Sequence, residues 1–485
     1  MAEDNKSLFK HFIYVGTGTI ISMIIGIITT PIITRLYLPD EYGQYSMFLT
    51  YGELIYITLG FGMDQALARF YYDNPSNEYK ISLVKKCIRV PMFFGIFLQV
   101  LVIFLVVKGI FFGGGQDSAV VMLGTFYVVI LILNRFLSIL LRLENRTKIY
   151  GFIGVFQKIT FFIIVLGIYF LIGVRNAIGL CIGALISQLA SMVVGFWGDK
   201  DILQCRKKYN EEMLSQKELF LYAFPFVFSV AISSLFQTLD RLFVKEYCGY
   251  YEVGIYSSAM SIIHIFAIIQ TSFTTIWIPN AIKKYSESKE NKEYYSEMSK
   301  MMAFLMFFLG VLLIVFKDII IFMLGEKYRE AAGIIPFLVY VPIMYTISET
   351  TVVGLVFMKK SSWQIIPPSI ACVVNFIGNY LLVPIFGGKG AAVSTGISYI
   401  VFLYARTFLS NKCYFIDFGL KKMIFITLIT IGYAIEVTFF DLSVISICFG
   451  IILLCIIALT YREQMIRVMQ LGRKYFLRCG NEKVQ

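Results

Sequence analysis

Eight ionisable side chains lie within or at the ends of apolar stretches long enough to cross a lipid bilayer. The deeper ones are Glu53, Asp64, Arg135, Lys158, His264 and Glu349, and two more, Arg69 and Arg142, lie near the expected inner ends. A charge at the centre of a membrane helix costs roughly 2.5–3.5 kcal/mol on insertion scales, so such groups usually face a cavity or a partner. Carboxylates are the hardest of these groups to explain otherwise, since they cannot reach far toward the headgroups, whereas Arg69 and Arg142 could extend to the inner membrane surface.

Helical spacing groups these side chains with other polar residues. Glu53 and Asp64 are eleven positions apart and would share one face of a helix. Arg135, Ser138 and Arg142 would also share a face. Two further polar stripes are Ser229, Ser233, Gln237 and Asp240, and Ser257, Ser261, His264, Thr271 and Thr275. We expect these stripes to line one polar cavity.

The elements that carry these residues are typical of a membrane protein. Of 485 residues, 58% are hydrophobic and only 15% are charged, and the mean hydropathy is +0.75. Apolar runs long enough to cross roughly 30 Å of hydrocarbon recur along the chain. We therefore predict an all-α integral membrane protein with about 14 transmembrane helices. The predicted helices are 8–34, 43–70, 83–107, 118–143, 149–173, 176–197, 218–244, 253–280, 301–324, 330–358, 363–386, 390–410, 421–440 and 442–461.

Charge predicts the orientation of these helices. If the N-terminus is cytoplasmic, most of the 43 lysine and arginine residues fall in cytoplasmic segments, as the positive-inside rule requires. Both termini are then expected in the cytoplasm. The net charge of +12 is spread over short loops, so it does not indicate a nucleic-acid partner.

Two short motifs recur at nearly the same separation. Residues 41–46 read EYGQYS and residues 252–257 read EVGIYS, 211 positions later, while 173–177 matches 387–391 at an offset of 214. An even number of helices per repeat gives both halves the same orientation, so we expect a parallel repeat. The predicted organisation is an N-lobe at 1–200, a cytoplasmic linker at 201–217, a C-lobe at 218–412, and two helices with a basic tail at 413–485.

The repeat also predicts charge pairs. Offset 211 places Glu53 on His264, and offset 214 places Arg135 on Glu349. We expect each pair to flank a central cavity on opposite walls.

The sequence lacks the motifs of an enzyme or an ATP-driven pump. It has two histidines, no HExxH, no P-loop, and nine cysteines without a CxxC pair. We expect no catalytic residues, no metal and no cofactor, and energy from an ion gradient or from the substrate's own gradient.

Three segments resemble one family. RLYLPDEYGQYS (35–46), FPFVFSVAISSLFQTLDRLFVKEYCGYYEVGIYS (224–257) and NYLLVPIFGGKGAAVSTGISY (379–399) are similar to bacterial polysaccharide exporters. These are the Wzx-type lipid-linked oligosaccharide flippases of O-antigen and capsule synthesis, in the multidrug/oligosaccharidyl-lipid/polysaccharide superfamily. The resemblance implies two six-helix lobes around a central, largely cationic cleft, with two C-terminal helices, in the bacterial inner membrane. The related peptidoglycan lipid flippases carry arginines in the first helix, and this chain has none between His11 and Arg35.

The resemblance also implies roles. The protein would carry undecaprenyl-pyrophosphate-linked oligosaccharide outward by alternating access, with a polymerase and glycosyltransferases as partners. Four cations would draw in the pyrophosphate: Arg135, Lys158, Arg142 and Arg69. Four groups would bind a coupling H⁺ or Na⁺, or exchange partners between states: Asp64, Glu53, Glu349 and His264.

Three alternatives remain open. A drug/cation antiporter of the same superfamily would have a carboxylate-rich cleft. A glycan polymerase or ligase would carry a large outer loop with catalytic groups. A scaffold would point its polar stripes at partner proteins.

Overall fold

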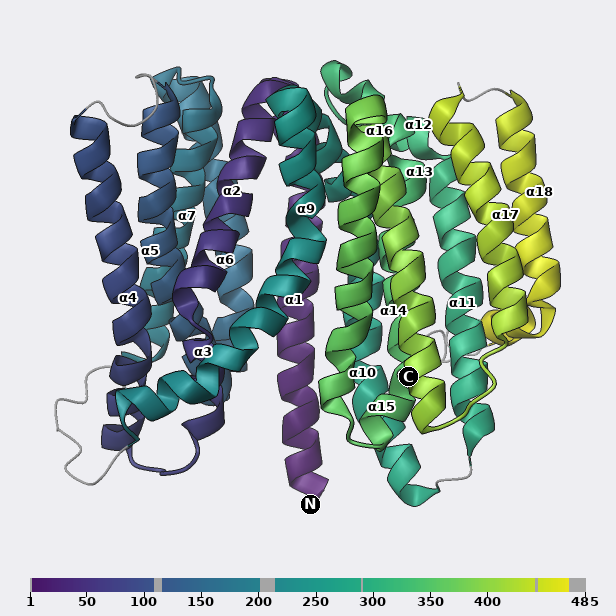
Figure 1. Ribbon diagram of the computed structural model, residues 1–485, viewed down its shortest axis with the longest axis horizontal. Helices are drawn as coiled ribbons and strands as arrows, with labels where there is room; N and C mark the ends of the chain where they lie inside the picture. The colour runs from purple at the N-terminus through teal and green to yellow at the C-terminus, as the bar shows by residue number, and fades with distance from the viewer. Residues whose placement is uncertain (1, 109–115, 201–213, 289–290, 441–443, 471–485) are drawn as a thin grey trace, which may run out of the picture. The chain divides into compact units, whose positions relative to one another are not determined.

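The computed structural model describes residues 2–108, 116–200, 214–288, 291–440 and 444–470. All regular secondary structure in these ranges is helical, which confirms the all-α prediction (Figure 1). The chain divides into two compact units, residues 1–257 (unit 1) and 258–485 (unit 2). Most of the predicted linker and the end of the predicted tail, 201–213 and 471–485, lie outside the described residues.

The helices follow the apolar runs closely. In unit 1 they are α1 (Ala2–Leu36), α2 (Pro39–Gly60), α3 (Met63–Phe70), α4 (Asn77–Val107), α5 (Gln116–Leu143), α6 (Thr147–Gly167), η1 (Ile168–Ile172), α7 (Ala177–Gly198) and α9 (Gln216–Ile263), which runs across the unit boundary. In unit 2 they are α10 (Phe266–Glu287), α11 (Lys292–Val315), α12 (Lys317–Ile321), η2 (Glu326–Gly333), α13 (Ile335–Leu338), α14 (Tyr340–Thr351), α15 (Val353–Phe357), η3 (Ser361–Ile365), α16 (Ile366–Cys413), α17 (Leu420–Phe439) and α18 (Val444–Thr460).

Among the described residues, ten helices are long and apolar enough to cross a membrane, or up to eleven if one bent pair counts as a single span. Two of the ten are merged: α9 has non-helical backbone at Gly249 and α16 at Gly387, so each contains two helices. The chain is therefore a multi-pass membrane protein. The figure of about 14 spans stays a prediction.

Several predicted helices are broken rather than continuous, and two of them carry polar faces predicted from the sequence. The predicted helix 43–70 divides into α2 and α3 at Phe61 and Gly62, whose φ angles are 49° and 66°. A Cβ at Gly62 would lie 2.5 Å from the carbonyl oxygen of Ala223, so the close approach of α9 requires glycine there. The predicted helix 253–280 is likewise interrupted between α9 and α10, at His264 and Ile265. The left-handed backbone at Phe61 and Gly62 means that Glu53 and Asp64 do not lie on one continuous helix. At Ile265 the backbone keeps right-handed angles (φ −55°, ψ −40°), so the polar stripe of 257–275 stays a prediction.

The turns after equivalent helices support the internal repeat. Asn145 and Lys359, both left-handed, have φ angles of 55° and 54° and are 214 positions apart, as are Gly173 and Gly387 with φ angles of 79° and 57°. Backbone hydrogen bonds recur at the same offset. The N–H of Arg146 donates to the Leu141 carbonyl at 2.9 Å, and that of Lys360 to the Leu355 carbonyl at 3.0 Å. The repeat found in the sequence therefore corresponds to a repeated turn at Asn145 and Lys359, whereas Gly173 (ψ 11°) and Gly387 (ψ −136°) share only a positive φ.

Within unit 1, the two copies of the EYGQYS-like motif pack on each other. The hydroxyls of Ser46 and Ser257 are hydrogen-bonded at 2.7 Å across α2 and α9. A Cβ on Gly43 would lie 1.9 Å from the Tyr250 carbonyl oxygen, and one on Gly254 would lie 2.0 Å from the Pro39 carbonyl oxygen. The two contacts are equivalent under the repeat. Adding 211 to residue number 43 gives 254, and adding 211 to 39 gives 250, so each helix presents its glycine to the carbonyl group of the other. The two motifs thus cross around a local twofold axis.

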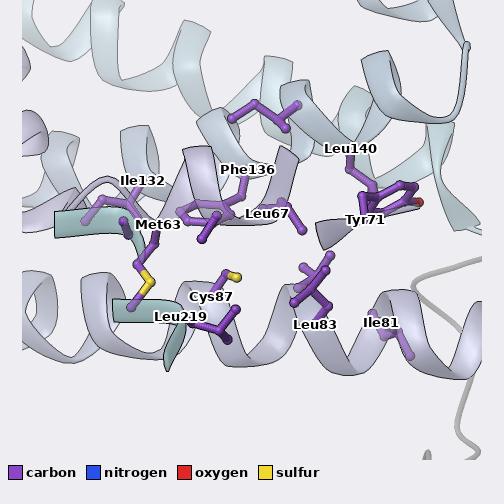
Figure 2. Packing of buried hydrophobic residues seen from close by; sticks show 14 of the residues in the cluster. Met63, Leu67, Tyr71, Ile81, Leu83, Cys87, Ile132, Phe136, Leu140 and Leu219 are labelled. Atoms are coloured by element: carbon purple, nitrogen blue, oxygen red, sulfur yellow. The ribbon is translucent and has the colours of Figure 1, made fainter. Parts of the chain in front are cut away.

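An apolar cluster packs α3, α4 and α5 together in unit 1. Figure 2 shows Leu67, Leu83, Cys87, Phe136 and other side chains of this cluster pointing toward one another. Each of the four is at most 2% exposed. Through this packing the short helix α3 is held against α4 and α5.

A polar cluster closes one end of this core, outside the membrane spans. Glu144 accepts hydrogen bonds from the Tyr71 hydroxyl at 2.5 Å and the Lys80 ammonium at 2.7 Å. Burial alone would raise the pKa of Glu144, but the bonds from Lys80 and Tyr71 outweigh it and lower that pKa overall. The ion pair joins the segment after α5 to α4.

We expect Glu144→Gln to lower the free energy of unfolding by about 1.5 kcal/mol at pH 7, since it removes a charge-assisted hydrogen bond. A carboxyl with a lowered folded-state pKa stabilises the protein above its unfolded pKa, and the contribution is lost as pH falls through the folded pKa. The difference between variant and wild type should therefore disappear in acid. Thermal unfolding in detergent between pH 3.5 and 7.5 measures it, with the exposed Glu326→Gln as control. A difference that is constant across this range would contradict the assignment.

Candidate functional site

Arg135 of α5 is the centre of a charged cluster in unit 1. Its guanidinium lies 5.8 Å from the ring centroid of Tyr56, which is only 6% exposed. The carboxylates of Glu53 and Asp64 are close enough to act on Arg135 electrostatically. Arg135 itself is exposed although it lies eight residues before the end of α5, about 12 Å into the helix by helical rise. Its charge is therefore accessible at depth and has counter-charges beside it.

Glu53 and Asp64 reach this cluster from two helices rather than from one face. Glu53 lies on α2, and Asp64 lies in the first turn of α3, after the break at Phe61 and Gly62. The Gln65 amide donates a hydrogen bond to Asp64 at 3.0 Å. The prediction that both carboxylates lie on one face of a single helix is wrong, because the helix breaks between them, but both act on Arg135.

The other predicted cations do not join the cluster by direct contact. Lys158 of α6 and Arg142 in the last turn of α5 are exposed, and neither forms a hydrogen bond or ion pair with the residues that the structure describes. Arg69 pairs with Asp73 one helical turn away, at 3.2 Å, and both side chains are about half exposed. The Arg69 pair is a surface ion pair, so Arg69 is the weakest of the four anion-binding candidates.

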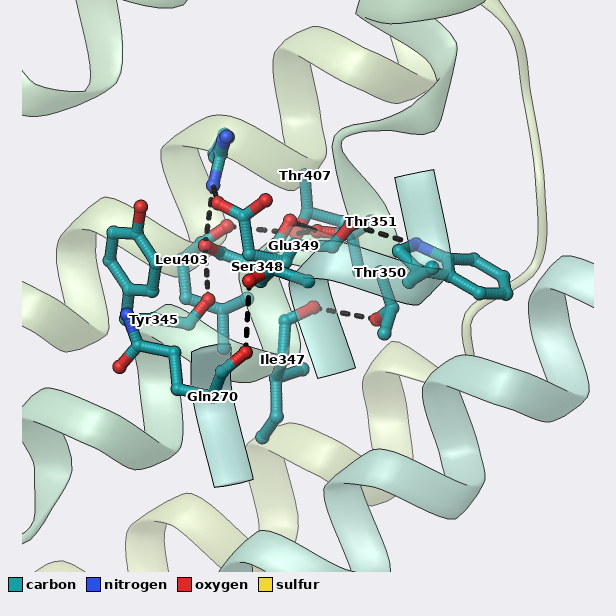
Figure 3. Close-up of polar contacts among 12 residues, drawn as sticks. Gln270, Tyr345, Ile347, Ser348, Glu349, Thr350, Thr351, Leu403 and Thr407 are labelled. Atoms are coloured by element: carbon teal, nitrogen blue, oxygen red, sulfur yellow. Dashed lines mark hydrogen bonds and ion pairs between the residues drawn. The ribbon is translucent and has the colours of Figure 1, made fainter. Parts of the chain in front are cut away.

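In unit 2 the predicted site residue Glu349 forms a buried ion pair that the sequence reasoning missed. Its Oε1 accepts from the Arg406 guanidinium at 2.7 Å, and the two side chains are only 11% and 12% exposed. Arg406 also donates to Ser348 Oγ at 2.8 Å and lies 5.4 Å from the Phe402 ring centroid. Figure 3 shows Glu349 amid Ser348, Thr351 and Thr407 where α14 meets α16.

The same helix–helix contact recurs in unit 1 with neutral partners. Asn134 donates to Ser191 Oγ at 2.7 Å, joining α5 to α7. The two partners are 57 positions apart, as are Glu349 and Arg406, and the two pairs are offset by 215 (349 minus 134). This offset is one more than the 214 of the repeat, so a polar bridge joins the corresponding helices in both units, but one position out of register and without charge in unit 1.

The positions of His264 and the remaining stripe residues do not indicate a common site. His264 is exposed at the break between α9 and α10. The hydroxyls of Thr271 and Thr275 donate to carbonyls of their own helix, and Asp240 is buried and accepts from the Tyr256 hydroxyl at 2.7 Å. The predicted pairs Glu53–His264 and Arg135–Glu349 join different units and stay predictions.

With this geometry in view, comparisons with known proteins identify the family. Residues 8–280, more than half of the chain, match the family of polysaccharide biosynthesis proteins. The chain belongs to this family. The capsular polysaccharide biosynthesis protein CapF of Staphylococcus aureus is 20% identical over 421 residues, covering 84% of this chain and 100% of CapF.

Solved structures share the fold of this polysaccharide biosynthesis protein. The lipid II flippase MurJ in an inward closed conformation has a TM-score of 0.69 at 18% identity, covering 93% of this chain and 100% of that one. An outward-facing MATE-family multidrug transporter of the MOP superfamily has a TM-score of 0.57 at 12% identity, covering 83% and 95%. These matches confirm the predicted fold.

Arg406 shows what the sequence reasoning overlooked. It lies four residues before the end of the predicted helix 390–410 and is not among the eight ionisable residues that the sequence singled out. The available signal was the pair Thr407 and Ser410, which follow Arg406 on the same helix and are three positions apart. Both form hydrogen bonds to the segment Thr351–Gly354.

Together the two clusters differ in what they can do. The Arg135 cluster carries one positive and two negative charges when fully ionised, and all three groups are at least partly exposed. It can exchange a counter-ion. The Glu349–Arg406 pair is neutral as a whole and nearly enclosed, so it serves first to join α14 to α16.

Proposed function

We propose that this protein is a flippase that moves an undecaprenyl-pyrophosphate-linked oligosaccharide across the bacterial inner membrane by alternating access. The observation that carries the proposal is Arg135, an accessible guanidinium at membrane depth, in a chain of the polysaccharide biosynthesis family. The fold shared with a protein named as a lipid II flippase supports it. Both termini would lie in the cytoplasm, and the polyprenyl tail would remain in lipid.

The proposed binding step is a competition for Arg135. Glu53 and Asp64 act on the guanidinium when no substrate is bound. A pyrophosphate would compete with them, and in a low-dielectric cleft a doubly charged anion interacts strongly with a guanidinium. Lys158, exposed and without a partner among the described residues, would supply a second positive charge, with Arg142 and Arg69 farther out.

The same competition for Arg135 would couple transport to the binding of an ion. A proton or a sodium ion on Glu53 or Asp64 would reduce their hold on Arg135 and free it for the anion. Ion binding can shift the transport cycle only by its differential affinity for the two states. Glu349 is a weaker coupling candidate, because it must first leave Arg406, and His264 would contribute only if it meets a partner in another state.

We expect Arg135→Ala to reduce surface polysaccharide to about a tenth or less of the wild-type amount, as loss of a charged hydrogen bond weakens binding by a factor of about ten or more. Lys158→Ala should have a smaller effect in the same direction. Both are compared at matched protein level in a strain lacking the chromosomal copy. Arg329→Ala, at an exposed ion pair, is the matched control. Undiminished export in both Arg135→Ala and Lys158→Ala removes the pyrophosphate role.

A second candidate is an ion-coupled drug/cation antiporter. It is favoured by one observation: the Arg135 cluster holds two carboxylates against one cation. This function would make Glu53→Gln and Asp64→Asn the damaging variants, with Arg135→Ala comparatively mild. Cell survival in the presence of cationic dyes distinguishes it from the flippase.

A further inference from the structure

A pocket of about 370 Å³ lies within unit 1, and its lining residues include none of Arg135, Glu53 and Asp64. Its volume is at the lower end of those of small-molecule sites. Three segments line it: α2 from Gln44 to Ile55, the start of α5, and the turn of α9 around Gly249. The lining residues are Gln44, Met47, Phe48, Tyr51, Gly52, Ile55, Val120, Val121, Gly124, Thr125, Lys245 and Tyr250.

Polarity changes along the pocket. Lys245, Tyr250 and Gln44 lie near one end, where α2 begins and α9 turns. Ile55 lies eleven residues farther along α2, about 16 Å away by helical rise. Between them the wall is formed by Met47, Phe48 and the valines of α5. One end is thus cationic and polar and the other is apolar, as an amphiphile lying along the membrane normal would require.

Lys245 supplies the charge at the polar end. Its ammonium lies 6.0 Å from the Tyr250 ring centroid and 3.7 Å from the Glu246 carboxylate. The Glu246 side chain is 74% exposed, so this contact is a loose surface pair and leaves the lysine able to bind another anion.

One helical turn before Lys245, Arg241 adds a second cation on the same side of α9. Its guanidinium donates to Thr50 Oγ1 of α2 at 3.3 Å, while its buried Nε has no hydrogen-bond partner among the residues that the structure describes. The α2–α9 seam beside the pocket therefore carries two cations, and one of them has an unsatisfied donor.

Glycines keep the pocket open. Gly52 and Gly124 are both part of its wall. A Cβ on Gly124 would meet only the Phe48 ring, at 3.7 Å, which is ordinary contact. Alanine is therefore tolerated at Gly124, whereas a leucine side chain would extend into the pocket. The Cβ of a larger residue at this position is therefore accommodated, and the rest of its side chain would occupy pocket volume.

We propose that this pocket binds a phosphate-bearing lipid, with the phosphate at Lys245 and an apolar chain running along α2 toward Ile55. Phosphate is the anion that lipids offer at the depth where membrane helices end, and the apolar length fits several methylene groups of a chain. The inference does not depend on the proposed transport function. The same chemistry is offered by a bulk anionic phospholipid and by an isoprenoid diphosphate.

Titration calorimetry of the full-length protein in a neutral maltoside detergent tests the proposal with two soluble probes. Dihexanoyl phosphatidylglycerol represents the phospholipid and farnesyl diphosphate the isoprenoid. We expect at least one probe to bind the wild type, with affinity reduced about tenfold or more by Lys245→Ala. Gly124→Leu should also abolish binding, while Gly124→Ala and Lys245→Arg should retain it. Lys108→Ala, which removes an exposed lysine outside the pocket, is the matched charge control.

The pattern across the probes identifies the source of the lipid. Binding of phosphatidylglycerol alone assigns a membrane phospholipid, binding of farnesyl diphosphate alone assigns an isoprenoid, and binding of both supports the shared phosphate chemistry. Absence of binding by both probes overturns the proposal. Equal affinity in wild type, Lys245→Ala and Gly124→Leu overturns it as well, because binding would then occur elsewhere. Circular dichroism and gel filtration establish that each variant is folded.

Discussion

Replacing Arg406 with alanine is expected to lower the free energy of unfolding by about 3–5 kcal/mol, because it leaves a buried carboxylate without its counter-ion. Glu349 is only 8% exposed, and its nearest positive charge is the Arg406 guanidinium at 2.7 Å. The backbone carbonyl of Glu349 already accepts from Trp277 Nε1 at 3.1 Å, so Glu349 is held in place while it loses its partner. Thermal unfolding in detergent and the amount of protein in the membrane both measure the loss.

A double variant without either charge distinguishes two contributions to stability: the destabilisation caused by one unpaired buried ion, and the net stabilisation that the intact ion pair provides. The double variant Glu349→Gln with Arg406→Met should regain most of the stability that Arg406→Ala loses, since well-packed neutral groups often replace a buried ion pair at little cost. Arg329→Ala, at a pair exposed on the surface, should change stability by less than about 0.5 kcal/mol. An Arg406→Ala protein as stable as Arg329→Ala would show that Glu349 is not buried in the folded protein.

Glu349 also shows which features of the site can be predicted from the sequence and which cannot. The apolar runs predicted the helices because hydrocarbon selects long apolar segments wherever they occur. The cost of charge at depth singled out Glu349 and Arg135 for the same reason. Which side chain neutralises each of them depends on which helices pack together, and the periodicity of one helix contains no information on its neighbours. Arg406, 57 positions away, was therefore not found.

The break between α2 and α3 could not be predicted from the local sequence either. Phe61 and Gly62 adopt left-handed angles because α9 approaches α3 closely there, with the Ala223 carbonyl in the space a side chain would need. Only a contact distant in sequence explains this break. The turns at Gly173 and Gly387 were more accessible to prediction, since both glycines stood at matching positions of a recognisable repeat.

The repeat supplies the second large expected effect, at Gly43 and Gly254. Alanine at a helical glycine normally stabilises a helix by about 1 kcal/mol. Here the added Cβ would lie 1.9 Å from the Tyr250 carbonyl oxygen or 2.0 Å from that of Pro39. Neither contact can be relieved by rotating a side chain, so the backbones of α2 and α9 must separate by more than 1 Å. We expect each variant to lose about 3 kcal/mol or more of stability, the upper range for overpacking.

Gly26→Ala provides the matched control, because a Cβ on Gly26 of α1 would meet nothing within 4 Å. This variant should be as stable as wild type or slightly more stable. The two damaging substitutions act on a single crossing, where Ser46 and Ser257 are hydrogen-bonded to each other. Once the first alanine has separated the helices, the second should add little, so the double variant should lose clearly less than the sum of the single losses. Unfolding midpoints in detergent are compared among wild type, the two single variants and the double variant. Additive losses would mean that the two glycines lie in independent contacts.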